Sequence, residues 1–471
     1  MKIKLGLENL SVNDIASYCF GRLVVNDGFD HTIEYVCTDS REVDEKTLFI
    51  VTVGERVDGH NYIESAKKLG CKAFLCQYIP NGVECDDCAF IVVDDSVAAF
   101  SHLASGYRSK KKMPSVAITG SVGKTTTKEI VASVMREKYN VYSTDGNFNS
   151  VIGMPMSLME APIDKELGVF EMGMSGFGEI RSMSTCASPS VAIVTNIGTS
   201  HLEYLKTREN IRLAKLEIAA GLTHGGHLIL NGDEPLLLEA KDVVGRDDIN
   251  YIYISLGENA NSDYIAENVR LFGTYSIFDI NAKGRVIKDV YVHIPGKHIV
   301  FNALCAYAAS EIFGLSEEQY RCGISKYTPV GNRQNIYDSG NVKFIADCYN
   351  AAPESMRAAI SVLCGFEGRK IAVLGDMKEL GDASDKLHFE LGQYISNKCD
   401  MLFTYGESAS KIADGAVFSG FSPDNVFSYS QDECDAIAVR ISEMLRSGDV
   451  VLFKASRSMK LENIIEKLEI R

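Results

Sequence analysis

The sequence predicts an α/β protein of three domains, and three observations support this prediction. Its length of 471 residues corresponds to about three domains of roughly 150 residues each. From residue 115 onward, short apolar runs bounded by Gly, Asn or Asp alternate with segments of helical period, as in a parallel sheet covered by helices. Two breaks, the lysine-rich segment 109–112 and the segment 327–331, divide the pattern. We therefore expect domains at residues 1–108, 109–326 and 327–471.

Each domain is expected to combine strands with helices. Residues 1–108 mix short strand-like runs with helical stretches. The central domain is predicted to hold parallel strands at residues 115–119, 168–172, 191–195 and 227–230. Runs rich in Tyr, Val and Ile that alternate with polar residues indicate a small antiparallel insert at residues 251–255, 275–280 and 290–294, before a helix at 300–313. The last domain resumes the alternation, with strands at 342–346, 371–374, 401–404 and 450–453.

The composition is that of an ordinary globular protein, and the net charge excludes some partners. Hydrophobic residues make up 46% and charged residues 24% of the chain. The net charge of -15 argues against a general nucleic-acid binder and against docking on an anionic membrane. A small anionic substrate stays compatible with this charge, because a few local cations can hold it.

The N-terminal segment and the cysteines favour a cytoplasmic protein. Residues 1–20 carry acids among their apolar residues, unlike a signal peptide, and no apolar run is long enough to span a membrane. The 13 cysteines are odd in number and scattered, as expected of free thiols. Cys71, Cys76, Cys85 and Cys88 raise a zinc alternative, but a strand-like run separates the first pair, so free thiols are favoured.

A phosphate-binding loop follows the first central strand. The segment from Gly120 to Thr127 joins strand 115–119 to a helical segment, so backbone N–H groups and a helix N-terminus point at one place. Lys124 is expected to reach the outer phosphates of ATP, and the Thr125 hydroxyl to bind Mg²⁺. The loop departs from the common form, because Ile118 stands where the first glycine is usual. The expected nucleotide contacts are Gly120, Ser121, Gly123, Lys124, Thr125 and Thr126.

Polar side chains also follow the neighbouring predicted strands. Ligands of open parallel sheets bind beyond the carboxyl ends of the strands. Those ends hold Thr119, Gly120, Glu171, Asn196, Asp347, Gly375, Asp376 and Lys454. Glu171 is a candidate Mg²⁺ ligand, because this cation prefers oxygen donors. His201 and Lys215 follow the third central strand and complete a set of candidate charged groups, although nitrogen is a less usual ligand for Mg²⁺.

The segment from Thr119 to Glu129 resembles the ATP loop of the Mur ligases, ATP-dependent amide-forming enzymes of peptidoglycan precursor synthesis. The resemblance covers nearly the whole chain, through segments 38–41, 54–60, 147–155, 347–353, 374–381 and 454–457. It implies a ligase that joins D-alanyl-D-alanine to UDP-N-acetylmuramoyl-tripeptide through an acyl phosphate. It also implies a uridine-nucleotide domain, a central ATP-binding domain and a Rossmann-like C-terminal domain for the dipeptide, in a monomer.

Residue roles follow from the resemblance at the matching positions. Glu171 and His201 match ligands of a second Mg²⁺, and Lys215 matches a lysine that is carbamylated in related ligases. Lys124, Glu171, His201 and Lys215 form the implied catalytic set. Asn302 matches the adenine contact, and Arg333 and Asp347 match residues that hold the nucleotide. The implied substrate contacts are Ser40, Arg41, Arg56, Asn147, Asn149, Asn350 and Asp376.

Three departures from the family pattern leave the acceptor open. Ser150, Ala352 and Ala455 replace the usual Asn, Asn and Gly. Losing an amide at position 352 removes hydrogen-bonding groups close to where the amine substrate is expected, and such a change can alter specificity strongly. A paralogue with another amine acceptor or UDP-linked peptide is therefore the alternative. An ATP-binding scaffold without activity is disfavoured, because the charged set is retained.

Overall fold

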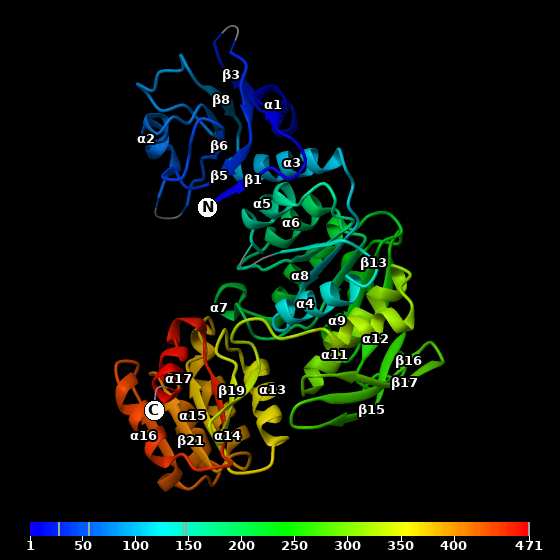
Figure 1. Cartoon of the computed structure of the whole chain (residues 1–471), viewed down its shortest axis with the longest axis vertical. Coiled ribbons are helices and arrows are strands. Elements are labelled where there is room, and N and C mark those ends of the chain that lie inside the picture. Colours follow the sequence, from blue (N-terminus) through cyan, green and yellow to red (C-terminus); the bar gives the residue numbers. More distant parts are fainter. Residues whose placement is uncertain (27–28, 55–56, 145, 147, 470–471) are drawn as a thin grey trace.

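In the computed structural model, three large sheets follow one another along the chain (Figure 1). The structure describes residues 1–471 except 27–28, 55–56, 145, 147 and 470–471. The strands of each sheet come from one continuous part of the sequence, and helices cover the sheets. The predicted α/β class is therefore confirmed.

The N-terminal sheet has six strands, of which the inner four are parallel. Its order is β1 (Lys2–Lys4), β5 (Tyr35–Cys37), β6 (Thr47–Ile50), β7 (Ala73–Cys76), β8 (Ala89–Val92) and β3 (Arg22–Val24). Two short strands, β2 (Leu10–Ser11) and β4 (Thr32–Ile33), pair separately. The helices of this part are α1 (Val12–Cys19), α2 (Ile63–Lys68) and α3 (Ser96–Ser109).

Helix α3 joins the N-terminal and central parts of the molecule. It packs on α1 on one side and on α5 (Gly153–Glu160) and α6 (Glu179–Ala187) on the other. The guanidinium of Arg108, in its last turn, is buried and donates to the carbonyl of Ala161 at 3.0 Å. Because α3 continues to Ser109, the lysine-rich segment expected to be a linker is in part the end of a helix.

The central sheet has nine strands. Its order is β10 (Val141–Ser143), β11 (Leu167–Glu171), β9 (Ser115–Thr119), β12 (Val191–Val194), β13 (His227–Asn231), β14 (Asn250–Ser255), β15 (Tyr264–Leu271), β16 (Ser276–Ala282) and β17 (Arg285–Val292). Val116 and Ile118 of β9 belong to the same core as α4 (Lys124–Met135) and α11 (Lys297–Ile312). Ala117 points the opposite way, toward the core that contains α5 and α6. The sheet is thus covered on both faces, which explains its continuous apolar strands.

The expected antiparallel insert is real but was placed wrongly at its start. β14, expected to belong to the insert, is parallel to β13, and Tyr251 pairs with Leu228. The antiparallel part is β15, β16 and β17, and β15 was not predicted. Its pairing shifts register between Glu267 and Arg270, which breaks the alternation that identifies a strand in sequence.

The C-terminal sheet has six strands, and only the edge strand β18 runs antiparallel to its neighbour. Its order is β18 (Asn335–Ser339), β19 (Val342–Ala346), β23 (Val450–Lys454), β20 (Lys370–Gly375), β21 (Met401–Tyr405) and β22 (Val426–Tyr429). One face packs on α13 (Pro353–Cys364), α14 (Ser384–Ile395) and α15 (Ser410–Phe418). The other face packs on α16 (Cys434–Met444) and α17 (Glu462–Glu469).

Shorter helices complete the fold. They are α7 (Leu202–Leu205), α8 (Arg208–Leu216), α9 (Pro235–Leu238), α10 (Ala240–Val244) and α12 (Glu317–Ser325). Single 3-10 turns lie at Gly59–Tyr62, Glu217–Gly221, Gly381–Ala383, Pro423–Asn425 and Arg457–Met459. Within the described part of the chain, no helix has the length and apolar character needed to cross a membrane.

The cysteine cluster of the first domain lies in an apolar core. Cys71, Cys76 and Cys88 are buried together with Phe49, Phe74 and Phe90. Burial raises the thiol pKa of Cys71 and of Cys76 to about 12. Within the described part of the chain, no group of three or more His, Cys, Asp or Glu side chains is placed to hold a metal ion.

Candidate active site

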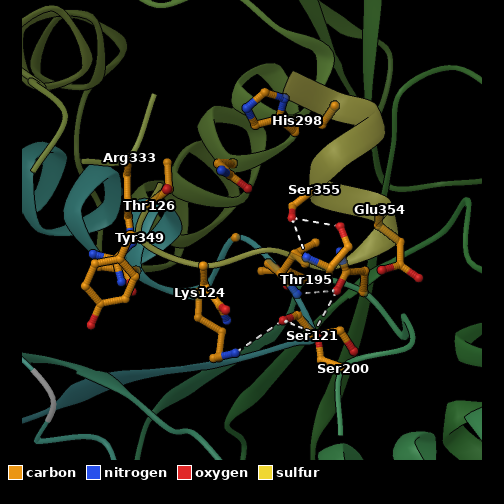
Figure 2. Close-up of a pocket in the computed structure, with 18 of the residues that line it drawn as sticks. Ser121, Lys124, Thr126, Thr195, Ser200, His298, Arg333, Tyr349, Glu354 and Ser355 are labelled. Atoms are coloured by element: carbon orange, nitrogen blue, oxygen red, sulfur yellow. Dashed lines mark hydrogen bonds between the residues drawn. The ribbon is translucent and has the colours of Figure 1, made fainter. Parts of the chain in front are cut away.

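A cavity of about 700 Å³ lies between the central and C-terminal sheets (Figure 2). Its walls come from the phosphate loop, the ends of β11 and β12, the first turns of α11 and α13, and the segment around residues 327–350. The structure brings together in this lining many of the residues that the sequence singled out: Ser121, Gly123, Lys124, Thr125, Thr126, Asn149, Glu171, His201, Asn302, Arg333, Asp347 and Asn350.

The phosphate loop connects β9 directly to α4. Gly120 has a φ of 152°, and a Cβ atom there would lie 1.8 Å from the Oγ1 of Thr195, so this position requires glycine. Gly123, with a φ of 83°, precedes the first helical residue, Lys124. The first N–H groups of a helix have no partner within the helix, and here they face the cavity that Lys124, Thr125 and Thr126 line. This arrangement suits a phosphate chain.

The loop is shaped by residues that follow β12. The Oδ1 of Asn196 accepts the N–H groups of Ser121 and Val122, at 2.9 and 3.0 Å. The Thr195 hydroxyl donates to the carbonyl of Val122 at 2.7 Å, and the Ser200 hydroxyl donates to that of Ser121 at 3.3 Å (Figure 2). In the sequence Asn196 is only a polar residue at a strand end, and in the structure its side chain holds the phosphate loop.

Lys124 is folded back over its own loop. Its Nζ donates to the carbonyl of Gly120 at 2.8 Å and to that of Ser121 at 3.4 Å. Burial lowers the pKa of Lys124, the Glu171 carboxylate raises it in part, and the charge of Arg333 lowers it further. An anionic phosphate beside Lys124 would stabilise its charged form.

Glu171 ends β11 with a carboxylate whose two oxygens are both bonded. Oε2 accepts the Thr125 hydroxyl at 2.6 Å, and Oε1 accepts the Asn149 amide at 2.9 Å. The residue is only 5% exposed. A carboxylate and a hydroxyl beside a phosphate loop are the hard oxygen donors that fit Mg²⁺.

His201 lies in the same cavity but faces a residue of the C-terminal part. Its Nδ1 lies 2.8 Å from Oε2 of Glu379, an ion-pair distance whose angle falls short of a hydrogen bond. This contact is the main cause that lowers the pKa of Glu379. His201 also has a φ of 64°, unusual for a residue other than glycine. The sequence groups His201 with Glu171 as metal ligands, and the structure places both in one cavity lining and adds the contact with Glu379.

Lys215 lies on α8 and is 1% exposed, outside the cavity lining. Burial lowers the pKa of its amine well below the usual value, and the charge of Lys124 lowers it further. Burial in such a place favours the neutral, nucleophilic form of a lysine amine. The structure is thus compatible with the predicted carbamylation.

The predicted nucleotide contacts Asn302, Arg333 and Asp347 lie around one side of the cavity. Asn302 is buried, its Oδ1 accepts the Thr127 hydroxyl at 3.0 Å, and its Nδ2 has no hydrogen-bond partner within the described chain. A buried amide nitrogen without a partner fits a ligand acceptor such as a base nitrogen. Asp347 accepts from Lys454 Nζ at 2.7 Å and from the Gln334 N–H at 3.1 Å, so it orders protein groups instead.

The other predicted substrate residues lie only in part at the cavity. Ser40 and Arg41 follow β5 in the N-terminal sheet, and Arg41 pairs with Asp39, whose pKa it lowers. Asp376 is buried and accepts the Ala409 N–H at 2.8 Å and Lys378 Nζ at 2.7 Å. Asn350 lines the cavity, with its Oδ1 accepting the N–H of Ala351 at 2.9 Å. Arg56 and Asn147 lie outside the described residues.

The three departures from the family pattern have visible surroundings. Ala352 precedes α13 without a side chain that could cap it, and the Ser355 hydroxyl bonds to the Ala352 N–H and carbonyl, both at 3.0 Å. The Ser150 hydroxyl accepts the Gly153 N–H at 3.1 Å at the start of α5. Ala455 is buried, and a Cβ atom added at Gly375 would lie 2.7 Å from the Cβ of Ala455.

A strand, a glycine loop and a helix at the carboxyl edge of a parallel sheet define the class of P-loop nucleotide-binding folds. Three family models match the chain: "Mur ligase family, catalytic domain" at 32–108, "Mur ligase middle domain" at 118–310 and "Mur ligase, glutamate ligase domain" at 332–457. The chain belongs to the Mur ligase family.

Similar proteins of known name share almost the whole chain. UDP-N-acetylmuramoyl-tripeptide–D-alanyl-D-alanine ligase of Bacillus subtilis is 40% identical over 97% of this chain and 98% of its own. The Escherichia coli enzyme of the same name is 30% identical over 94% of this chain and 95% of its own. A crystal structure of MurF from Acinetobacter baumannii superposes with a TM-score of 0.88 at 27% identity, and covers 100% of both chains. MurF ligase from Thermotoga maritima in complex with ADP has a TM-score of 0.81 at 28% identity, and the match covers 92% of this chain and 97% of that one.

Proposed function

We propose that this chain is an ATP-dependent ligase that joins D-alanyl-D-alanine to UDP-N-acetylmuramoyl-tripeptide in peptidoglycan precursor synthesis. The observation that carries the proposal is the full-length likeness to ligases of that name, 40% identical in the Bacillus subtilis relative. The cavity supports it, because a phosphate loop and a buried carboxylate from the central part face side chains of the C-terminal part. A nucleotide and an amine bound from the two sides would meet there.

The proposed reaction has two steps. The terminal carboxylate of the tripeptide attacks the γ-phosphorus of ATP, so ADP leaves and an acyl phosphate forms. The free amine of D-alanyl-D-alanine then attacks the acyl carbon, loses a proton, and expels inorganic phosphate to leave the amide. Lys124 and the first N–H groups of α4 stabilise negative charge on the transferring phosphoryl group, and Asn302 orients the base.

The residues at the end of β11 fit Mg²⁺. Thr125 and Glu171 would hold one ion, and Glu171 with His201 a second, for which His201 would first have to leave Glu379. Mg²⁺ supplies charge neutralisation on the phosphate oxygens. Carbamylation of Lys215 would convert a neutral buried amine and CO₂ into an anion that supports this site, with release of one proton.

The remaining roles complete the proposal. Ser40, Arg41 and Arg56 would contact the uridine nucleotide, and Asn147, Asn149, Asn350 and Asp376 the peptide substrates. The domain boundaries would lie near residues 108 and 327, consistent with sheets confined to either side of them. One chain contributes both walls of the cavity, which supports a monomer, and free thiols with nucleotide substrates favour the cytoplasm.

A different amine acceptor is the second candidate, and Ala352 is the observation that favours it. At this position the chain offers a methyl group where an amide is usual in the family, beside a cavity wall that also includes Ala351 and Ser355. An acceptor that is not hydrogen-bonded by an amide there would fit equally well.

Phosphate release by the purified protein tests both candidates. Release that requires ATP, UDP-N-acetylmuramoyl-tripeptide and D-alanyl-D-alanine together is the expected result. Equal rates with other dipeptides or with single amino acids would favour the second candidate. Absence of release with every amine tested would refute ligase activity.

A further inference from the structure

The guanidinium of Arg333 lies over the ring of Tyr349 at the wall of the cavity (Figure 2). Its Cζ is 3.5 Å from the ring centroid, which is the distance of face-to-face contact. We infer that Tyr349 is a positioning residue for the nucleotide, whose ring holds the Arg333 guanidinium ready for the phosphates of ATP. The inference rests on the proposed use of ATP.

The stacked geometry leaves the hydrogen-bonding edge of Arg333 available. No carboxylate within the described part of the chain forms an ion pair with Arg333. Arg457 differs, because it lies 5.7 Å from the same ring and pairs with Glu462 at 2.9 Å. A guanidinium that lies over an aromatic ring does not use its N–H groups to bind that ring. These donors stay free to form hydrogen bonds with a phosphate.

The backbone explains why these two side chains meet. β18 and β19 form a hairpin in which Asn335 pairs with Ala346. Beyond the strands, two bonds of 3.1 Å keep the segments together: the Gln334 N–H donates to the side-chain carboxylate of Asp347, and the Tyr349 N–H donates to the carbonyl of Asn332. These bonds hold the segment that carries Arg333 against the segment that carries Tyr349, and the left-handed φ of 48° at Gln334 ends the regular strand geometry before Arg333.

This backbone is anchored independently of the ring. Lys454 donates to the Asp347 carboxylate at 2.7 Å and to the carbonyl of Asn350 at 3.1 Å, on either side of Tyr349. Removing the ring should therefore release the Arg333 side chain and leave the hairpin in place. The effect expected of Tyr349 is on the orientation of a cation, not on the fold.

Arg333 is placed to act on the same ligand as Lys124. Both side chains line the cavity, and the charge of Arg333 is one of the causes, after burial, that lower the pKa of Lys124. Two cations that repel each other across a cavity are both stabilised when a polyanion lies between them. A free arginine spreads over many rotamers, so the stack reduces the entropy that is lost when the phosphates bind.

Substitutions of Tyr349 can distinguish the contribution of its ring to ATP binding from that of its hydroxyl. The variants are Tyr349→Leu, Tyr349→Phe, Arg333→Ala and the double variant of Y349L with R333A. Tyr394→Leu is a matched control, because Arg357 lies 5.6 Å over the Tyr394 ring and neither residue lines the cavity. Calorimetry with ATP alone measures the Kd, and phosphate release gives the KM for ATP and kcat.

Y349L should raise the Kd and the KM for ATP about 3- to 10-fold, the effect of losing one cation–π contact. The value of kcat at saturating ATP should change less than the KM. Y349F should restore affinity to within about twofold of the wild type, since it keeps the π face. In the R333A background, Y349L should have little further effect. Tyr349→Met serves the same comparison if Y349L does not fold.

Three results would overturn the inference. The first is a Kd for ATP that is unchanged in Y349L. The second is an equal loss of affinity in Y349F, which would assign the effect to the hydroxyl, and the third is an undiminished effect of Y349L in the R333A background, which would indicate a general structural role. Wild-type protein that binds no ATP would be a different result, because it refutes the proposed function itself.

Discussion

Gly120 is the position at which a single methyl group should disturb both stability and nucleotide binding. A Cβ atom there would lie 1.8 Å from the Thr195 Oγ1, 3.1 Å from its Cβ and 3.2 Å from its backbone nitrogen. The hydroxyl must therefore rotate away, which breaks its 2.7 Å bond to the carbonyl of Val122. The backbone nitrogen cannot rotate away, so the loop itself must also shift.

The magnitude follows from these contacts. Loss of the Thr195 bond costs about 1 kcal/mol. A φ of 152° in a residue other than glycine costs about 1–3 kcal/mol more. We expect Gly120→Ala to lower the free energy of unfolding by about 2–4 kcal/mol. It should also weaken ATP binding at least tenfold, because the displaced loop carries the phosphate-binding N–H groups.

Urea unfolding and ATP calorimetry check this prediction. Gly245→Ala is the matched control, because Gly245 has a φ of 65° and a Cβ atom there would meet nothing within 4 Å, so it should lose only about 1 kcal/mol of stability and no ATP affinity. Thr195→Ala combined with G120A should recover part of the loss, since it removes the closest atom. Equal stability of G120A and the wild type would refute the reasoning.

Three further predictions concern the charged groups. Glu171→Gln should reduce phosphate release at least 100-fold at saturating Mg²⁺, with little loss of stability, because it keeps the shape but weakens a cation ligand; a Mg²⁺ titration of the rate checks this. Purified protein held under CO₂ should show a 13C carbamate signal that Lys215→Ala lacks, because burial favours the neutral form of the amine; an identical signal in K215A would assign it elsewhere. The pKa of Glu379 is lowered from 4.5, first by His201, so its contribution to stability is present above that value and is lost as pH falls through the lowered pKa. Glu379→Gln should flatten this acid-side dependence in urea unfolding at a series of pH values, and an unchanged profile would contradict it.

Much of the fold and part of the site could be predicted from the sequence. β9 and β19 lie at the predicted residues, and the other predicted parallel strands match within one or two. Their apolar runs are buried on both faces, so composition alone identifies them. The phosphate loop was predictable for a similar reason, because its strand, glycines, Lys124 and helix are contiguous. The pairing of β14 was not, because a strand's direction depends on a distant partner.

What the sequence by itself determined is therefore local: which segments form strands, where the phosphate loop lies, and which family's motifs the chain carries. The tertiary structure decided which groups act together. Asn196 bonds to Ser121 from 75 residues away, and His201 contacts Glu379, a residue to which the sequence assigns no role. Arg333 lies over the Tyr349 ring because the segments before β18 and after β19 are held together, which no sequence spacing reveals. The physical reason is that such contacts arise only when sheets and domains pack, and packing is fixed by the whole chain and not by any one segment.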